Sequence, residues 1–502
     1  MRPTEALFGP ALVLMSGRAV GFVAAFAIPL ILARLFDQQA FGTYKQLFLI
    51  YSTLFGIVQV GMAESLYYFL PSEHARKANY ILNVLLVLVA LGAAALLVLV
   101  TKQDSIVTLL NNEDLRPYLT LTGIYLVLML ASLVLEIVMT AEKQHVAASF
   151  AYALSDLGRA ALFLVPVLLF GGLRALLLGA IVFAVLRLIA TATYLYRNFR
   201  VGLQPDRALL KKQLQYALPF GLAGIIEMVQ ANFHLYVVSW YFDAATFAIY
   251  SVGCLQLPIT DFLMTSTSNV MMVQMREQLQ AGRKDAVLAI WLDAVRKLAL
   301  ILVPMVGVLV VLAHELIVFL FTDVYVSSVP VFIIWTTSML LAALLTDSLL
   351  RVHAENRFLI LQNCVRLTLI AVLIHPLLER YGLIGAVMVT FLAAIVAKVL
   401  ALWRTKVVLE VGLSQLLPWG SLAKILLLAT AAALPVLLMK LALPLPTDSL
   451  AAFAQLALNG GLYVVTYYLL LLWCGPMHDD EKQQLLHWTQ LPVARLCKAW
   501  KA

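Results

Sequence analysis

Charged side chains inside long apolar segments are the residues of this sequence that could do chemistry. Arg18 lies deep in the first apolar run, beside Ser16 and Gly17, and no carboxylate stands one turn away. Because a charge at the centre of a membrane span costs roughly 2.5–3.5 kcal/mol, such a group needs a polar partner or a wet cavity. A guanidinium offers a fixed fork of donors that matches phosphate oxygens. We therefore expect Arg18 to bind a phosphate group, and an ion pair made for packing is the alternative.

A second polar group lies in the apolar segment 214–241. Glu227, Gln230 and His234 are spaced three, four and seven residues apart, which places them on one face of a helix. A polar stripe on an apolar helix is expected to face a cavity. Glu227 is then a candidate for proton or sodium coupling or for pairing with Arg18, and His234 for titration near neutral pH. A polar seam between helices is the alternative.

Further charged residues complete the candidate set. Glu64 and Asp261 occupy broadly corresponding places in the two halves of the chain and are expected to line the same cavity. Asp156 and Arg159 are three residues apart and can neutralise each other. Cations inside the apolar segments outnumber their evident carboxylate partners, which favours an anionic substrate. The candidate substrate-binding residues are Arg18, Glu64, Arg159, Arg187 and Arg366, and the candidate ion-coupling or gating residues are Glu227, His234, Asp261 and Asp156.

Composition decides the class of the protein. The 502 residues are 63% hydrophobic and only 12% charged, whereas soluble domains are nearer half apolar and a quarter charged. The four scattered cysteines suggest neither a disulfide framework nor a metal site, and no cleavable signal peptide is evident. The outer loops are short, and no hydrolase, Walker A or zinc motif occurs. We therefore expect an all-α integral membrane protein that is not an enzyme and needs no cofactor.

About fourteen stretches are near the length of roughly 20 residues that crosses a bilayer. They cover residues 7–35, 46–70, 80–100, 118–140, 149–171, 174–196, 214–241, 246–273, 298–321, 329–350, 358–378, 383–403, 418–440 and 449–473. With the N-terminus inside, about 20 of the 35 lysines and arginines fall in inside segments and about 6 in outside loops, a strong positive-inside signal. Both termini are therefore expected in the cytoplasm. The basic residues are dispersed over loops, so we expect contact with anionic lipids and none with nucleic acid.

The chain contains an internal duplication. The segment Phe36–Tyr44 recurs as Phe242–Tyr250: both copies read Phe-Asp, three residues, Phe, a small residue, one residue, Tyr. Three further landmarks recur in the same order, at offsets of 206 to 213 residues overall. Duplicated bundles are a common transporter design in which the substrate is handled between the halves. Asp37 and Asp243 are expected to cap the next helix, with the neighbouring aromatic residues at the membrane interface.

The duplication predicts a division of the chain. The expected parts are a first lobe of six spans at 1–200, a cytoplasmic linker at 201–213, a second six-span lobe at 214–406, two additional spans at 407–474, and an amphipathic cytoplasmic tail at 475–502.

The sequence resembles the multidrug/oligosaccharidyl-lipid/polysaccharide (MOP) exporter superfamily over nearly its whole length. Its pattern is most similar to the polysaccharide-transport branch, the Wzx-type O-antigen and oligosaccharide flippases. The residues that carry the resemblance are Leu32-Ala33-Arg34-Leu35-Phe36, Phe41-Gly42-Thr43-Tyr44, the run from Gly61 and Glu64 to Leu70-Pro71, the second copy Phe242 to Tyr250, and Tyr381-Gly382-Leu383-Ile384-Gly385-Ala386.

The resemblance implies a V-shaped pair of six-helix lobes around a cationic cavity in the bacterial inner membrane. Such a protein moves an undecaprenyl-diphosphate-linked oligosaccharide from the cytoplasmic to the periplasmic leaflet by alternating access, and Arg18 best matches the diphosphate-binding arginine. Related flippases are coupled to protons, sodium or the membrane potential. The expected partners are the lipid-linked oligosaccharide, membrane lipids and a polysaccharide polymerase or assembly machinery, with the chain itself a monomer.

Three alternatives remain open at this point. A lipid II flippase of the same superfamily also has fourteen spans, the last two forming a lipid groove. A multidrug/cation antiporter usually has twelve spans and depends on carboxylates such as Glu227 or Asp261. A non-transporting subunit of a polysaccharide synthase complex is the alternative from another functional class.

Overall fold

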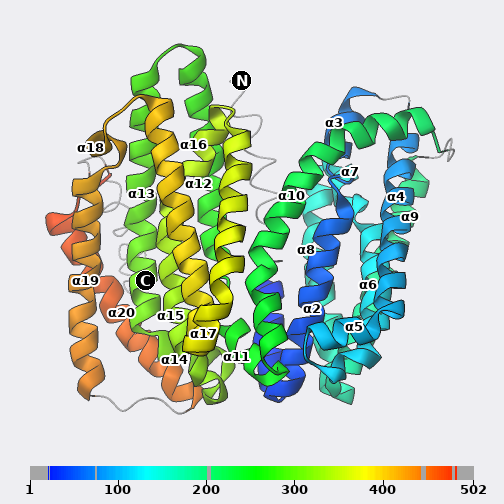
Figure 1. Cartoon of the computed structure of the whole chain (residues 1–502), viewed down its shortest axis with the longest axis horizontal. Helices are drawn as coiled ribbons and strands as arrows, with labels where there is room; N and C mark the ends of the chain where they lie inside the picture. The colour runs from blue at the N-terminus through cyan, green and yellow to red at the C-terminus, as the bar shows by residue number, and fades with distance from the viewer. Residues whose placement is uncertain are drawn as a thin grey trace, which may run out of the picture. The chain divides into compact units, whose positions relative to one another are not determined.

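The computed structural model describes residues 21, 23–73, 76–199, 205–442, 448–477 and 481–482, in which all regular elements are α-helices or short 3-10 helices (Figure 1). By length and composition ten of the described helices could cross a membrane, or eleven if one bent pair is counted as a span. The chain is thus an all-helical, multi-pass membrane protein, while the number of fourteen spans stays a prediction. Arg18 and nearly all of the predicted tail lie outside the described residues.

The chain forms two compact units, which we describe separately: Met1–Val252 with Ile360–Ala393, and Gly253–Leu359 with Ala394–Ala502. The described helices of the first unit are Val23–Leu35, α2 (Gln38–Gln59), α3 (Ser65–Ser72), α4 (Lys77–Thr101), α5 (Gln103–Leu109), η2 (Glu113–Leu115), α6 (Arg116–Ser132), α7 (Val134–Ala141), α8 (His145–Phe170), α9 (Gly172–Asn198), α10 (Arg207–Tyr241) and nearly all of α11 (Ala244–Gly253).

The second unit contains the remaining helices. They are α12 (Pro258–Gln280), α13 (Lys284–Val311), α14 (Ala313–Phe321), η3 (Asp323–Ser328), α15 (Val329–Ser338), η4 (Met339–Leu344), α16 (Thr346–Val352), α18 (Leu413–Leu416), α19 (Trp419–Ala442) and α20 (Ser449–Cys474). The long helix α17 (Asn356–Leu409) contributes to both units. It covers two predicted spans and is interrupted at Gly382, whose φ is 58°. The predicted lobe boundaries stay predictions.

The helix α10 begins inside the segment that was predicted to be a linker. Asp206 caps it by accepting hydrogen bonds from the backbone N–H groups of Ala208 (2.9 Å) and Leu209 (3.1 Å). These bonds satisfy two of the donors that every helix start leaves unpaired. Residues 207–213 are therefore helical, and Gln213 is buried against α4 through a bond to the Tyr80 carbonyl (3.2 Å).

The structure confirms the helix-capping role of the duplicated aspartates. The Asp37 carboxylate accepts from the Ala40 backbone N–H at 2.7 Å, and the Asp243 carboxylate accepts from the Thr246 N–H at 2.9 Å. Another of the duplicated landmarks, Gly172-Leu173 with its second copy Gly382-Leu383, has a common geometry too. Gly172 and Gly382 both have positive φ, 72° and 58°, which glycine adopts without steric cost.

The expected position at the membrane interface is wrong for four of the six duplicated aromatics, while Phe36 and Phe242 are partly exposed. Instead of anchoring the helices at the membrane interface, Phe41, Tyr44, Phe247 and Tyr250 are all buried within the protein, none more than 6% exposed. The physical reason is close helix packing. A Cβ atom built on Gly42 would come within 1.8 Å of the Ala244 carbonyl oxygen, so the starts of α2 and α11 touch backbone to backbone and enclose their neighbours.

The C-terminal helices α19 and α20 pack on α13 and α14 within the second unit. The hydroxyl of Tyr463 donates to the Ala429 carbonyl (3.1 Å) and that of Tyr467 to the Leu300 carbonyl (3.2 Å). Lys440 pairs with the fully buried Glu315 at 2.8 Å. These bonds satisfy the two tyrosine hydroxyls and pair the buried charges of Lys440 and Glu315, as a membrane interior requires.

Candidate functional site

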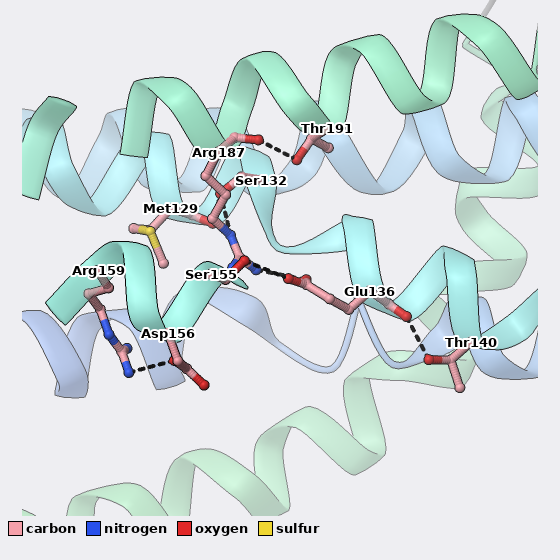
Figure 2. A network of polar contacts seen from close by, with 9 residues as sticks. All are labelled: Met129, Ser132, Glu136, Thr140, Ser155, Asp156, Arg159, Arg187 and Thr191. Atoms are coloured by element: carbon pink, nitrogen blue, oxygen red, sulfur yellow. Dashed lines mark hydrogen bonds and ion pairs between the residues drawn. The ribbon is translucent and has the colours of Figure 1, made fainter. Parts of the chain in front are cut away.

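A buried ion pair between α9 and α7 is the most enclosed charged group of the first unit (Figure 2). The Arg187 Nη2 lies 2.7 Å from the Glu136 Oε2, with 12% and 2% of the two side chains exposed. The Arg187 Nε also donates to the Ser132 hydroxyl (3.2 Å), and the Ser155 hydroxyl donates to Glu136 (3.3 Å). Three helices therefore hold this guanidinium in one orientation, neutralised by its partner.

Sequence positions explain how this network forms. Ser132 and Glu136 are four residues apart across the junction of α6 and α7, so both reach toward α9 on the same side. The Thr191 hydroxyl donates to the Arg187 carbonyl one turn earlier (2.8 Å), and the Thr140 hydroxyl does the same to the Glu136 carbonyl (2.7 Å). Each threonine hydroxyl is thus satisfied within its own helix, and neither threonine competes for the ion pair of Arg187 and Glu136.

A second, more open ion pair lies on α8. The Arg159 Nη2 donates to the Asp156 Oδ1 at 2.7 Å, as the three-residue spacing predicted, and 30% and 28% of the side chains are exposed (Figure 2). The Arg159 Nε has no hydrogen-bond partner among the described residues. Gly21 lies directly against the carboxylate, because a Cβ at that position would meet the Asp156 Oδ2 at 2.0 Å. Arg159 therefore retains donors for an anion.

Aromatic rings line the same part of the first unit. Tyr51 and Tyr125 have ring centroids 4.8 Å apart, and Phe48 contacts both, at 5.8 and 6.4 Å. Tyr125 also contacts Phe163, which lies one turn after Arg159 on α8, with ring centroids 6.0 Å apart. The arrangement combines a cation with aromatic faces and hydroxyl groups, which are the groups that bind phosphate and sugar rings.

The members of the polar stripe of α10 differ in burial, and whether the stripe faces a cavity stays a prediction. Gln230 and His234 are buried, but Glu227 is exposed on the surface of the unit. The His234 Nδ1 shares a hydrogen bond of 2.8 Å with the Tyr250 hydroxyl. His234, a candidate from the sequence, is thus paired with a tyrosine of the duplicated segment.

Glu64 and Asp261 have different surroundings. Glu64 follows a break between α2 and α3 where Val60 and Gly61 have φ of 45° and 69°. The Glu64 Oε2 is buried without a partner among the described residues. Asp261, in the second unit, is exposed in the first turn of α12. The expected equivalence of the two carboxylates is therefore not visible in their local structure.

Sequence reasoning missed several polar partners. Glu136 and Glu315 neutralise Arg187 and Lys440, and Asp347 pairs with Lys398 (3.1 Å). The expected excess of cations is correspondingly smaller. A systematic search for carboxylates in apolar segments would have found Glu136 and Glu315, but not their partners.

A buried amide network was missed as well. The Gln46 amide nitrogen donates to the Leu110 carbonyl (3.0 Å) and to the Ser239 hydroxyl (2.7 Å), joining α2 to α10. The Asn112 amide nitrogen donates to the Gln46 Oε1 (2.6 Å). The sequence does not predict this network, because Gln46 and Asn112 are single amides in different apolar segments and nothing in the spacing indicates that they meet.

The profile of a family described as polysaccharide biosynthesis protein matches residues 31–330, more than half of the chain. No curated protein sequence matches. Among solved structures, the lipid II flippase MurJ in an inward closed conformation is similar with a TM-score of 0.70 and 12% identity, covering 92% of this chain and 98% of its own.

Transporters of the MOP superfamily are similar as well. An inward-facing multidrug resistance MATE family transporter has a TM-score of 0.58 and 16% identity, over 80% of this chain and 99% of its own. A MOP superfamily transporter from Pyrococcus furiosus has a TM-score of 0.55 and 15% identity, over 80% of this chain and 95% of its own. At these identities the likeness establishes the fold. The chain belongs to the polysaccharide biosynthesis protein family and has the fold of MOP-superfamily transporters.

Proposed function

We propose that this protein is a flippase that moves an undecaprenyl-diphosphate-linked oligosaccharide from the cytoplasmic to the periplasmic leaflet of the bacterial inner membrane. Membership of the polysaccharide biosynthesis family over residues 31–330 is the observation that carries the proposal. Polysaccharide biosynthesis needs a membrane protein that moves the lipid-linked repeat unit across the bilayer. A multi-pass protein without an enzymatic motif fits that task.

The extent of the structural likeness supports a lipid substrate over a drug. The match to the lipid II flippase extends over 92% of this chain. The match to the multidrug transporter extends over 80% of this chain, although it includes 99% of the transporter. The difference is about the size of a helix pair. Helices α19 and α20 are the additional pair that the sequence predicted, and they are held to the second unit by buried bonds.

The first unit offers a place for the diphosphate. The Arg187 guanidinium is engaged by Glu136 and Ser132, so its role is structural. Arg159 is half-buried, and its Nε has no partner among the described residues. We assign the diphosphate contact to Arg159, together with Arg18, whose role rests on the sequence alone.

Ion coupling follows from the same pair. A proton on Asp156 would release Arg159 for the diphosphate, and departure of the phosphate would restore the pair at 2.7 Å. The exchange is possible because the Asp156 carboxylate and the diphosphate compete for the same Arg159 guanidinium. In this proposal Asp156 is the coupling carboxylate.

Reconstitution tests the function. Purified protein in liposomes that contain a fluorescent undecaprenyl-diphosphate oligosaccharide should make the label in the inner leaflet accessible to a membrane-impermeant quencher. Protein-free liposomes and liposomes with Asp156→Asn provide the controls, and the Asn variant should no longer respond to a pH gradient. A wild-type protein that never exposes the labelled lipid would support a non-transporting subunit of a synthase complex instead.

The same assay separates the alternatives. Labelled lipid II in place of the oligosaccharide lipid tests the lipid II flippase, and a fluorescent cationic drug tests a multidrug antiporter. Faster movement of either than of the oligosaccharide lipid would overturn the proposed substrate.

A further inference from the structure

A groove of about 520 Å³ lies in the second unit, between the end of α12 and the end of α16. Its charged walls are Arg276 and Glu277 on α12 and Arg351 on α16. None of the groove's residues belongs to the proposed transport site, which lies in the first unit. The volume is within the range of small-molecule sites, roughly 300–1,000 Å³.

The two arginines have donors to spare. The Arg276 Nη1 donates to the Val352 carbonyl at 3.3 Å, which holds the guanidinium at the groove while its other N–H groups remain available. The Arg351 side chain makes no hydrogen bond or ion pair with any other residue that the structure describes. Asp347, four residues before Arg351 on α16, is engaged by Lys398. Two guanidiniums against one carboxylate leave the groove positively charged.

The remaining wall is apolar. Met272 and Val273 lie one turn before Arg276 and Glu277 on the same helix, so an apolar surface continues from the charged end of the groove along α12. In the sequence, the apolar run Val270–Val273 of α12 is followed by Arg276 and Glu277, and the charged residues Arg283, Lys284 and Asp285 come next, before and at the start of α13. Such a change marks the level at which a span leaves the hydrocarbon, where lipid phosphates lie.

We propose that this groove binds an anionic phospholipid of the surrounding bilayer, with its phosphate between Arg276 and Arg351 and its acyl chain along Met272 and Val273. The positive charge selects the phosphate, and bidentate guanidinium geometry fits its oxygens. The apolar wall explains why a lipid, rather than a soluble phosphate, occupies the groove. The proposal is independent of whether the protein transports an oligosaccharide.

The test is a lipid titration of the full chain purified in detergent. Phosphatidylglycerol should raise the unfolding temperature of the wild type in a saturable manner, and phosphatidylcholine should not. Arg351→Gln should weaken the apparent affinity by about fivefold to tenfold. The double variant Arg276→Gln/Arg351→Gln should abolish the shift. Because Arg351 has no described partner, the single variant keeps the fold even where the double variant does not.

A matched control removes the same charge elsewhere. Arg283→Gln/Arg357→Gln deletes two exposed arginines of the same unit that do not line the groove, and it should leave the titration unchanged. Equal weakening in this control would overturn the site. So would inorganic phosphate that reproduces the shift at the lipid's concentration, or undecaprenyl diphosphate that displaces phosphatidylglycerol at a lower concentration. Normal lipid binding by a protein that fails the flippase assay would refute the transport proposal alone.

Discussion

Gly42 in the first copy of the duplicated segment lies against Ala244 in the second copy. A Cβ at position 42 would approach the Ala244 carbonyl oxygen to 1.8 Å, so the two copies meet at a backbone contact that only glycine permits. The duplication is therefore more than a record of symmetry. It places two capped helix starts, those of α2 and α11, together within one compact unit.

This contact gives the first prediction. Gly42→Ala should destabilise the protein by at least the roughly 1–3 kcal/mol of an overpacked core, because the clash is with backbone that cannot turn aside. Thermal unfolding of the purified protein measures the effect. Gly224→Ala is the matched control: it lies in α10 with no atom within 4 Å of the added Cβ, so it should be neutral or slightly stabilising. Equal unfolding temperatures for the two variants would contradict the contact.

The buried pair of α7 and α9 gives a second prediction. Glu136→Gln or Arg187→Gln alone should cost about 3–5 kcal/mol, because each leaves an uncompensated buried charge. The double variant should recover much of that loss, which a double-mutant cycle measures. Glu410→Gln, which breaks the exposed pair with Lys284, should cost about 0–1 kcal/mol. A double variant as unstable as the sum of the singles would argue against direct pairing.

The amide network of α2 predicts a specific cost. Gln46→Leu removes one hydrogen bond each from Asn112, the Leu110 carbonyl and Ser239, so it should destabilise by about 1–3 kcal/mol. Gln59→Leu on the same helix is the control, since among the described residues the Gln59 side chain bonds only the Phe55 carbonyl of its own helix. Chemical unfolding monitored by tryptophan fluorescence compares them. The network is not important for stability if both variants unfold alike.

Asp243 predicts a pH dependence. Hydrogen bonds from the Thr246 hydroxyl and backbone N–H lower the pKa of this carboxyl below its ordinary value of 3.8. The ionised Asp243 carboxylate therefore contributes its full stabilisation at pH values above the ordinary pKa of 3.8. This stabilisation is lost as the pH falls through the lower pKa of the folded state. Asp243→Asn keeps the cap and should flatten the acid limb of the stability curve, whereas Asp243→Ala should cost about 1 kcal/mol at neutral pH. Parallel acid limbs in the wild type and the Asn variant would refute this role.

Arg159 carries the functional prediction. Arg159→Gln should lower the rate of lipid movement by at least about tenfold, the value of one lost charge-assisted bond, while stability changes little because the pair with Asp156 is half exposed. Arg174→Gln, which removes an exposed arginine at the start of α9, should leave the rate unchanged. An equal loss in both variants would indicate a general charge effect rather than a diphosphate contact.

The sequence by itself determined the membrane class, the duplication, the family resemblance and the helix starts at Asp37 and Asp243. These features depend on composition and on neighbours three or four residues apart, which chain geometry fixes in advance. The pairing of Asp156 with Arg159 was predictable for the same reason.

Only the tertiary structure decided which distant groups meet. Arg187 pairs with Glu136, which is 51 residues away in the sequence. Asp347 pairs with Lys398 rather than with the nearby Arg351. Four of the duplicated aromatics became core residues because Gly42 lets two helices touch. The physical reason is that a buried charge or ring is placed by the packing of whole helices. A linear sequence shows which side chains need a partner, but not which helix brings that partner within reach.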